Sequence, residues 1–171
     1  MGITKLLENQ FIVKDKPTVI YSGELHYFRI DPEFWDDRLK KAKDAGLNTI
    51  STYIPWRYHE FEENKIDFDG TINPKNNIKL FLDLVNKHKL YFIPRIGPVS
   101  NAELIREGVP NWVKIKYPDT YLKPLIDNEF GDHNMLSYCS PKLLELVDNW
   151  YKEVSAILIP YLKKNIISIQ L

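Results

Sequence analysis

Cysteine is nearly absent from this sequence, in which Cys139 is the only one. A single thiol can form no internal disulfide, so we expect a cytoplasmic protein without a disulfide framework. The N-terminus lacks the long apolar stretch of a signal peptide, and no apolar run is long enough to cross a membrane. We therefore expect neither a secretory leader nor a membrane partner.

The sequence also lacks an excess of charge of either sign. Its 23 Lys and Arg residues balance its 23 Asp and Glu residues, which gives a formal net charge of zero. Nucleic acids and anionic membranes attract basic surfaces, so this balance gives no electrostatic reason to expect either partner. With 44% hydrophobic and 27% charged residues, the chain of 171 residues is typical of one globular domain, or of part of a larger one.

Several motifs of catalysis and ligand binding are missing as well. The sequence has no Gly-x-Gly-x-x-Gly or P-loop pattern, which weakens the case for a nucleotide-binding sheet, and it has no Gly-x-Ser-x-Gly elbow. His59, Glu60 and Glu62 lie close together, but no second histidine follows at helical spacing and no cysteine cluster exists. We therefore expect no protein-bound metal and no cofactor.

The patterns that are present alternate between strand and helix. A short N-terminal hairpin is predicted first, with strands at 11–13 and 18–21 and a turn at 14–17. Helices are predicted to begin at Asp31-Pro32, Asn73-Pro74 and Ser140-Pro141, because such polar residues cap helices and proline suits the first turn. Further strands are predicted at 48–54, 91–96 and 166–170, the last as a buried strand.

Strands that are separated by helices imply parallel pairing with right-handed crossovers. Two architectures fit this order, a doubly wound open sheet and the first half of a (β/α)8 barrel. Long insertions at 55–73 and 97–140 favour the barrel, since barrel enzymes build their sites from loops at the carboxyl ends of strands. We predict an α/β fold that forms the first half of a TIM barrel, with four parallel strands after the hairpin, in one domain over 1–171.

Aromatic and ionisable side chains follow each of the first three strands of this sheet. Tyrosine and tryptophan rings suit stacking on a sugar, and polar groups can bind its hydroxyls, although each residue alone also fits a loop turn or a surface salt bridge. The residues are Glu24, His26, Tyr27 and Arg29, then Tyr53, Trp56, His59, Glu60 and Glu62, then Arg95, Asn101 and Glu103. The polar stretch 128–134, which contains His133, is predicted to be a solvated loop.

Several of these segments resemble, in order, the N-terminal half of the family 35 glycoside hydrolases, the β-galactosidases. The resemblance runs from about residue 11 to 171, and its clearest motifs are Ser-Gly-Glu-Leu-His-Tyr-Phe-Arg at 22–29, Ser-Thr-Tyr-Ile-Pro-Trp at 51–56, Arg-Ile-Gly-Pro at 95–98, Asn-Ala-Glu at 101–103 and Gly-Val-Pro-Asn-Trp at 108–112. The resemblance implies a retaining hydrolase on a (β/α)8 barrel that acts on terminal β-linked galactose.

The resemblance also implies roles for single residues. The positions that match the family's binding site for the non-reducing-end sugar are Tyr53, Asn101, Ala102 and Glu103. A carboxylate such as Glu103 would accept charge-assisted hydrogen bonds from sugar hydroxyls, and the Asn101 amide can both donate and accept. Arg95 and Glu24 would support the floor of the site.

This sequence departs from the family's pattern beside that site. The family usually has Arg-Pro-Gly-Pro-Tyr where this chain has Arg-Ile-Gly-Pro-Val at 95–99, so Val99 replaces an aromatic residue. The tryptophan and glycine-rich stretch that usually follow Ala-Glu are replaced by the residues 104–108. A galactoside substrate is expected, and a glucosaminide remains an alternative.

In the family, the acid/base glutamate follows the fourth strand and the nucleophile belongs to a later strand. The resemblance therefore implies that both catalytic glutamates lie beyond Leu171 and that none of the residues 1–171 is catalytic. We predict that the isolated chain is inactive and forms a homo-oligomer through the exposed edges of its half barrel. The alternatives are a non-catalytic sugar-binding or assembly module and another (β/α)8 glycosidase, such as an exo-β-glucosaminidase.

Overall fold

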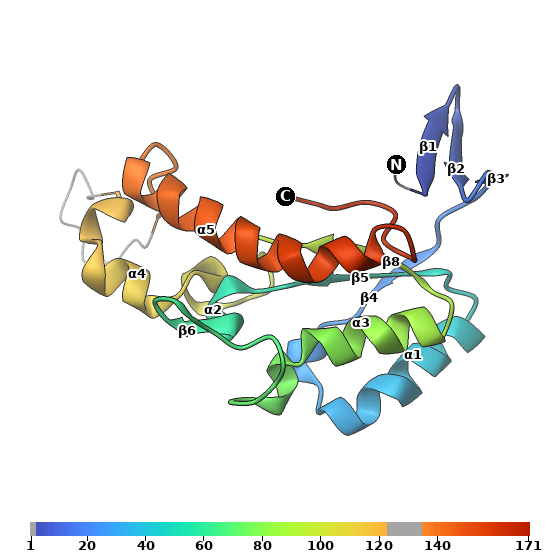
Figure 1. Cartoon of the computed structure of the whole chain (residues 1–171), viewed down its shortest axis with the longest axis horizontal. Coiled ribbons are helices and arrows are strands. Elements are labelled where there is room, and N and C mark those ends of the chain that lie inside the picture. The colour runs from blue at the N-terminus through green and yellow to red at the C-terminus, as the bar shows by residue number, and fades with distance from the viewer. Residues whose placement is uncertain (1–2, 123–134) are drawn as a thin grey trace.

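A three-stranded parallel sheet forms the centre of the computed structural model, which describes residues 3–122 and 135–171 (Figure 1). Its strands lie in the order β4 (Ser22–Glu24), β5 (Thr49–Tyr53) and β8 (Tyr91–Arg95). Every residue of β5 is buried, as expected of a central strand that is covered on both faces. Since the strands are parallel, their carboxyl ends lie at one edge of the sheet, followed there by loops. The predicted loop 128–134, with His133, lies outside the described residues.

Two helices connect these strands, α1 (Trp35–Asp44) and α3 (Ile78–Lys87), and they pack side by side (Figure 1). Each follows a 3-10 turn, η2 (Pro32–Phe34) or η3 (Pro74–Asn76), so the predicted starts lie one short turn before the α-helices. The side chain of Asn77 caps α3 by accepting a hydrogen bond from the Leu80 N–H at 3.0 Å. Asp36 joins the two helices through an ion pair with Lys87 and a hydrogen bond from His88, both at 2.8 Å.

The longest helix, α5 (Pro141–Leu158), lies along the other side of the strands in Figure 1 and continues into η6 (Ile159–Tyr161). The Ser140 hydroxyl accepts from the Leu143 N–H at 3.3 Å, which confirms the predicted start of this helix. Trp150 is buried and donates its indole N–H to the Ile96 carbonyl at 2.6 Å. The helix is thereby fixed to the chain just past β8.

The insertions after the strands form short elements of their own. A 3-10 turn, η1 (Tyr27–Arg29), follows β4. The segment after β5 contains α2 (Trp56–His59) and a hairpin of β6 (Glu60–Glu62) and β7 (Lys65–Ile66). The segment after β8 contains η4 (Ile105–Gly108), α4 (Asn111–Lys116) and η5 (Pro118–Thr120).

The predicted N-terminal hairpin is a three-stranded antiparallel sheet that projects from one end of the molecule (Figure 1). Its strands are β1 (Thr4–Leu7), β2 (Gln10–Val13) and β3 (Lys16–Pro17), with a tight turn at Lys14 and Asp15. The strand predicted at 18–21 is wrong, because this segment has no strand structure and leaves Val19 and Tyr21 exposed. The first parallel strand is β4 instead.

The fourth parallel strand, predicted at 166–170, is not formed as a continuous strand. Two isolated parallel bridges join this segment to β8, Phe92 with Ile166 and Arg95 with Gln170. The N–H groups of Phe92 and Ile96 donate to the carbonyls of Asn165 and Gln170, but Pro94 lies between them and has no N–H to donate. The ladder is therefore interrupted at Pro94, and burial ends at Ile167, so the chain from 168 onward is exposed.

Candidate functional site

A hollow of about 230 Å³ opens where β5 and β8 end. Tyr53 and Arg95 line it from the strand ends, and the other lining residues come from the next loop and from later segments: Gly97, Pro98, Val99, Asn101, Tyr138, Gln170 and Leu171. Of the four residues predicted to bind substrate, the structure brings Tyr53 and Asn101 together here. Loops at the carboxyl ends of parallel strands are where barrel enzymes place their sites.

Arg95, which lines the hollow, belongs to a polar network at the ends of three strands. Arg95 donates from Nη1 to Oε1 of Glu24 at 2.9 Å, and its guanidinium carbon lies 4.7 Å from the centre of the Tyr53 ring. The same Glu24 oxygen lies 3.0 Å from Nε2 of His26, whose ring meets the Tyr53 ring edge-on. Arg95 thus packs on the Tyr53 ring, while Glu24 contacts Arg95 and His26, and the supporting role of Arg95 and Glu24 stays a prediction.

Ala102 and Glu103 do not line the hollow. Ala102 is buried, and its carbonyl accepts a hydrogen bond from Nη2 of Arg29. The side chain of Glu103 is 88% exposed, and its carboxylate lies 3.6 Å from Nη1 of Arg29. Arg29 thus holds the turn that carries both residues, and Glu103 points to solvent beside the site.

The loop that carries Asn101 is anchored to α5 at its start. Next to the bond from Trp150 to the Ile96 carbonyl, the Tyr151 hydroxyl donates to the Gly97 carbonyl at 2.8 Å. Burial raises the pKa of Tyr151, which keeps this hydroxyl protonated as a donor. Gly97 has a φ of +83°, a left-handed conformation that glycine adopts without strain.

The sequence matches the family described as glycosyl hydrolases family 35 over residues 10–170. The chain belongs to family 35. It is 37% identical over 157 residues to an exo-β-D-glucosaminidase of Pyrococcus horikoshii, a match that covers 91% of this chain and 20% of that protein. It is 36% identical over 166 residues to a β-1,2-glucosyltransferase of Ignavibacterium album, covering 92% of this chain and 22% of that protein.

A mammalian relative agrees with the family, and a solved structure supports the fold. The β-galactosidase-1-like protein of Mus musculus is 34% identical over 165 residues, covering 95% of this chain and 23% of that protein. The chain thus spans about a fifth of the length of these relatives. A crystal structure of a β-galactosidase from the psychrophilic Marinomonas ef1 matches with a TM-score of 0.60 at 12% identity, over 84% of this chain and 20% of that one. This likeness supports a TIM-barrel type of α/β fold.

Two other predicted residues of this family 35 chain, Tyr27 and His59, lie in the interior instead of the hollow. The Tyr27 hydroxyl donates to Nε2 of His59 at 2.5 Å, and Nδ1 of His59 donates to the Asp67 carbonyl at 2.8 Å. Burial lowers the pKa of His59 to about 4 and raises the pKa of Tyr27. His59 is therefore neutral near pH 7 and acts as a structural hydrogen-bonding group.

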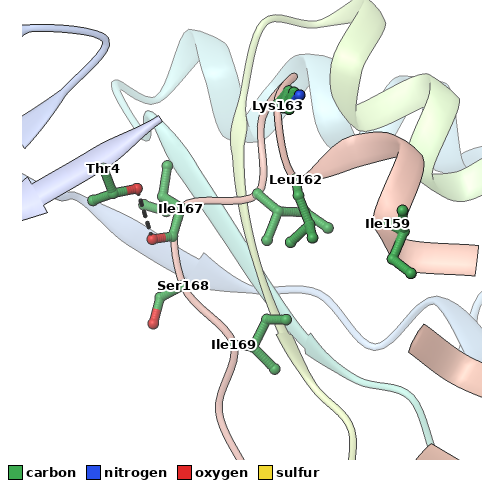
Figure 2. Close-up of a pocket in the computed structure, with 8 residues that line it drawn as sticks. Thr4, Ile159, Leu162, Lys163, Ile167, Ser168 and Ile169 are labelled. Carbon is green, nitrogen blue, oxygen red and sulfur yellow. Dashed lines mark hydrogen bonds between the residues drawn. The ribbon is translucent and has the colours of Figure 1, made fainter. Parts of the chain in front are cut away.

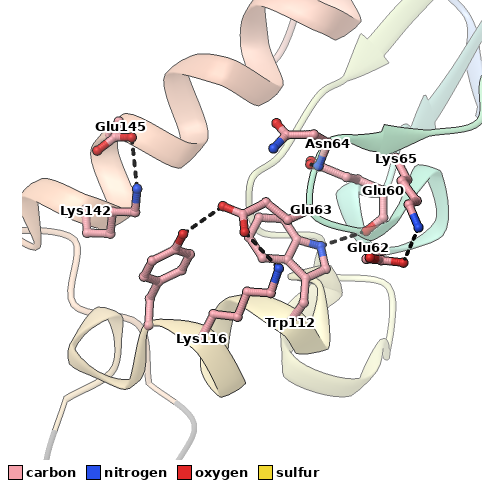
Figure 3. Close-up of polar contacts among 10 residues, drawn as sticks. Glu60, Glu62, Glu63, Asn64, Lys65, Trp112, Lys116, Lys142 and Glu145 are labelled. Atoms are coloured by element: carbon pink, nitrogen blue, oxygen red, sulfur yellow. Dashed lines mark hydrogen bonds and ion pairs between the residues drawn. The ribbon is translucent and has the colours of Figure 1, made fainter.

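Glu60 and Glu62 do not line the hollow and instead make contacts around the β6–β7 hairpin (Figure 3). The Glu60 carboxylate accepts from the Trp56 indole at 2.5 Å and from the Asn64 N–H at 2.8 Å, and burial raises its pKa. Glu62 pairs with Lys65 at 2.8 Å. Among residues 3–122 and 135–171, no three His, Cys, Asp or Glu side chains are arranged to hold a metal ion.

The neighbouring Glu63 joins this hairpin to α4. This contact was not predicted from the sequence. Its carboxylate accepts from Lys116 at 3.0 Å and from the Tyr117 hydroxyl at 2.8 Å, while the Trp112 indole donates to the Glu60 carbonyl at 3.0 Å (Figure 3). These contacts tie the insertions after β5 and β8 together. These contacts hold the loops around the hollow in place.

A second hollow, of about 370 Å³, has a different character. It is lined mainly by aliphatic side chains beside η6: Thr4, Ile159, Leu162, Lys163, Ile166, Ile167, Ser168 and Ile169 (Figure 2). The Thr4 hydroxyl donates to the Ile167 carbonyl at 2.9 Å, which links the N-terminal sheet to this segment. Lys163 is the only ionisable residue in the lining, so this hollow offers little for binding the hydroxyls of a sugar.

Residues of the first hollow that sequence reasoning missed come from distant segments. Tyr138 lies just before the cap of α5, and Gln170 forms the second bridge to β8, with Arg95. The position of Tyr138 offered one signal, since a loop that leads into a helix of a barrel starts at the carboxyl end of a strand.

In the described parts of the chain, no helix combines the length and apolar character needed to cross a membrane.

Proposed function

We propose that residues 1–171 form the N-terminal, sugar-binding part of the catalytic domain of a retaining β-galactosidase that hydrolyses terminal non-reducing β-D-galactosides. The observation that carries this proposal is the meeting of Tyr53 and Asn101 in one hollow at the carboxyl ends of β5 and β8. Membership of family 35 supports the reaction class, and the β-galactosidase-1-like relative supports the sugar.

Each binding residue has a role that its chemistry allows. Tyr53 and Asn101 line the hollow, and the Tyr53 hydroxyl and the Asn101 amide would bind hydroxyl groups of the sugar. Glu103 would accept from a further hydroxyl at the exposed rim, and Arg29 restrains the turn through the Ala102 carbonyl. Charge-assisted hydrogen bonds of this kind are stronger than neutral ones, so Glu103 would contribute most to affinity.

None of the glutamates in this chain is proposed as a catalytic group. Retaining glycosidases need two carboxyl groups about 5 Å apart, one as nucleophile and one as acid/base. Glu24 is paired with Arg95 and His26, and Glu103 is paired with Arg29. The residues 1–171 alone would therefore bind the sugar without hydrolysing it, and turnover would need catalytic glutamates supplied by the rest of the parent protein.

The proposal is tested with para-nitrophenyl β-D-galactoside, on the parent protein and on the isolated 171-residue chain in parallel. We expect turnover by the parent protein alone, and binding of galactose by both. Asn101→Ala should raise KM about 10-fold, the loss expected for a hydrogen bond to the substrate. Asn86→Ala, on the exposed surface of α3, is the matched control. Turnover by the isolated chain that survives repeated purification would contradict the assignment of the catalytic groups.

Exo-β-D-glucosaminidase activity is the second candidate, because the archaeal enzymes of that name share 37% and 33% identity with this chain. Val99 in the hollow also departs from the pattern of the β-galactosidases. Measurement of kcat/KM for para-nitrophenyl β-D-glucosaminide on the same parent protein separates the two, since the better substrate has the larger value. Binding of galactose with no hydrolysis of either glycoside by the parent protein would favour a non-catalytic sugar-binding module.

A further inference from the structure

The two tyrosines of the hollow differ in how much of their rings is free. Tyr53 is 9% exposed, one neighbour being the Arg95 guanidinium at 4.7 Å from the ring centre. The His26 ring lies edge-on to Tyr53, with the ring centres 6.0 Å apart. Tyr53 therefore offers its hydroxyl to a ligand, while its ring serves to hold Arg95.

Tyr138, in contrast to Tyr53, is mostly exposed. It is 62% exposed and, among the described residues, no aromatic ring or cation packs on it. Partial burial, with a smaller effect from Glu107, raises the pKa of its hydroxyl, which keeps the group neutral. A neutral phenol ring with an uncovered face, at the edge of a polar hollow, is suited to packing on the C–H face of a sugar.

The backbone holds Tyr138 in a defined place. Its turn is closed by a hydrogen bond from the Ser140 N–H to the Ser137 carbonyl, and the Ser137 N–H donates to the Thr120 carbonyl, both at 2.8 Å. Leu136 is buried on one side of the turn, and Ser140 caps α5 on the other. An aromatic ring on such a turn loses little conformational entropy when a ligand packs against it.

We infer that Tyr138 is the sugar-stacking and specificity-determining residue of this hollow, in the place of the aromatic side chain that Val99 does not provide. Val99 and Tyr138 line the same hollow from different segments, so Tyr138 brings to it an aromatic ring that Val99 does not. This inference rests on the proposed function. It adds the residue on which the galactoside packs, because the axial hydroxyl of galactose leaves a continuous apolar face of C–H groups on one side of the ring.

The test compares Tyr138→Ala, Tyr138→Phe and the control Tyr21→Ala in the parent protein, with para-nitrophenyl β-galactoside and β-glucosaminide. Tyr21 is 61% exposed and does not line the hollow, so it matches Tyr138 in type and exposure. We expect Tyr138→Ala to raise KM for the galactoside about 3- to 10-fold with kcat changed less than about 2-fold, and to affect the glucosaminide less. Tyr138→Phe should keep the KM of the unchanged protein, since the ring carries the effect.

Adding Val99→Tyr to Tyr138→Ala should restore at least part of the affinity, a gain that a merely structural role of Tyr138 would not give. The melting temperatures of all variants should agree with that of Tyr21→Ala. Equal KM values for Tyr138→Ala and Tyr21→Ala would overturn the inference and leave the proposed function intact. Failure of the unchanged parent protein to bind or hydrolyse either sugar would overturn both, and this is measured before any variant is made.

Discussion

The guanidinium of Arg95 lies over the ring of Tyr53, 4.7 Å from its centre, while Nη1 donates to Glu24 at 2.9 Å. The three residues stand at the ends of neighbouring strands, β8, β5 and β4. A single arginine therefore fixes the ends of the whole parallel sheet at the side where the candidate site opens.

Replacing Arg95 with lysine should weaken sugar binding more than it weakens the fold. A lysine ammonium cannot pack as a plane on Tyr53 while donating to Glu24, so both contacts would be compromised. We expect KM to rise about 10-fold and the free energy of unfolding to fall by about 1 kcal/mol. Arg38→Lys on α1, where the arginine makes an exposed pair with Asp37, is the control for loss of a guanidinium. Unchanged KM in Arg95→Lys would contradict this role.

Glu103→Gln should separate binding from stability. The side chain is 88% exposed, so its pair with Arg29 contributes little to folding, and the melting temperature should stay the same. Loss of the carboxylate charge should lower galactose affinity about 10-fold, which isothermal titration calorimetry measures directly. Glu33→Gln, at an exposed position near the start of α1, is the matched control. Equal affinities for the two variants would remove Glu103 from the site.

The elements that the sequence predicted well are those whose signals are local. Strand β5 is a run of β-branched residues and is buried throughout, and α5 begins at its predicted serine cap. The fourth strand was wrong because its pairing depends on the partner strand. The sequence places Pro94 within the predicted strand 91–96. Only the observed register shows that its missing N–H faces the residues 166–170.

Only part of the candidate site could be predicted from the sequence, because only some of its residues have local signals. Tyr53 and Asn101 follow neighbouring strands and meet in the hollow, as the topology implies. Tyr138 is far from both in the sequence, and its one signal is its place in a loop that leads into a helix. His59 was a candidate because of its neighbours in the sequence, whereas complete burial makes it part of the core.

Self-association through exposed apolar surface remains a prediction. Ile169 lines the aliphatic hollow of Figure 2 and is 40% exposed. Its segment lies alongside β8 and is joined to it only by isolated bridges. Unpaired strand edges with apolar side chains tend to pair with further chains. We expect the isolated chain to give a dimer mass or more by light scattering at micromolar concentration, and Ile169→Lys to shift it toward the monomer. Lys152→Ala, on α5, is a surface control, and a monomeric mass for the unchanged chain would contradict the prediction.

The interior pair of Tyr27 and His59 makes stability depend on pH in a defined direction. Burial holds the pKa of folded His59 at about 4, below the value of about 6.5 for an unfolded histidine. Near pH 7 the His59 imidazole is neutral in both the folded and the unfolded chain, so its full contribution to stability is present. As the pH falls from 6.5 toward 4, the unfolded chain gains a proton that the folded protein resists, and stability is lost. Between pH 7 and pH 5 the loss from this group should be about 2 kcal/mol.

Urea unfolding at pH 7 and pH 5 measures this loss in the isolated chain, and His59→Gln isolates it from the carboxylates that titrate in the same range. Glutamine gains no charge on acidification, so the variant should lose about 2 kcal/mol less than the unchanged protein between the two pH values, although it is less stable at pH 7. Tyr27→Phe is the companion variant, because it removes the hydrogen bond to Nε2 and leaves the imidazole buried. Its pH dependence should therefore stay close to that of the unchanged chain. Equal losses for His59→Gln and the unchanged chain would show that the imidazole is protonated without unfolding.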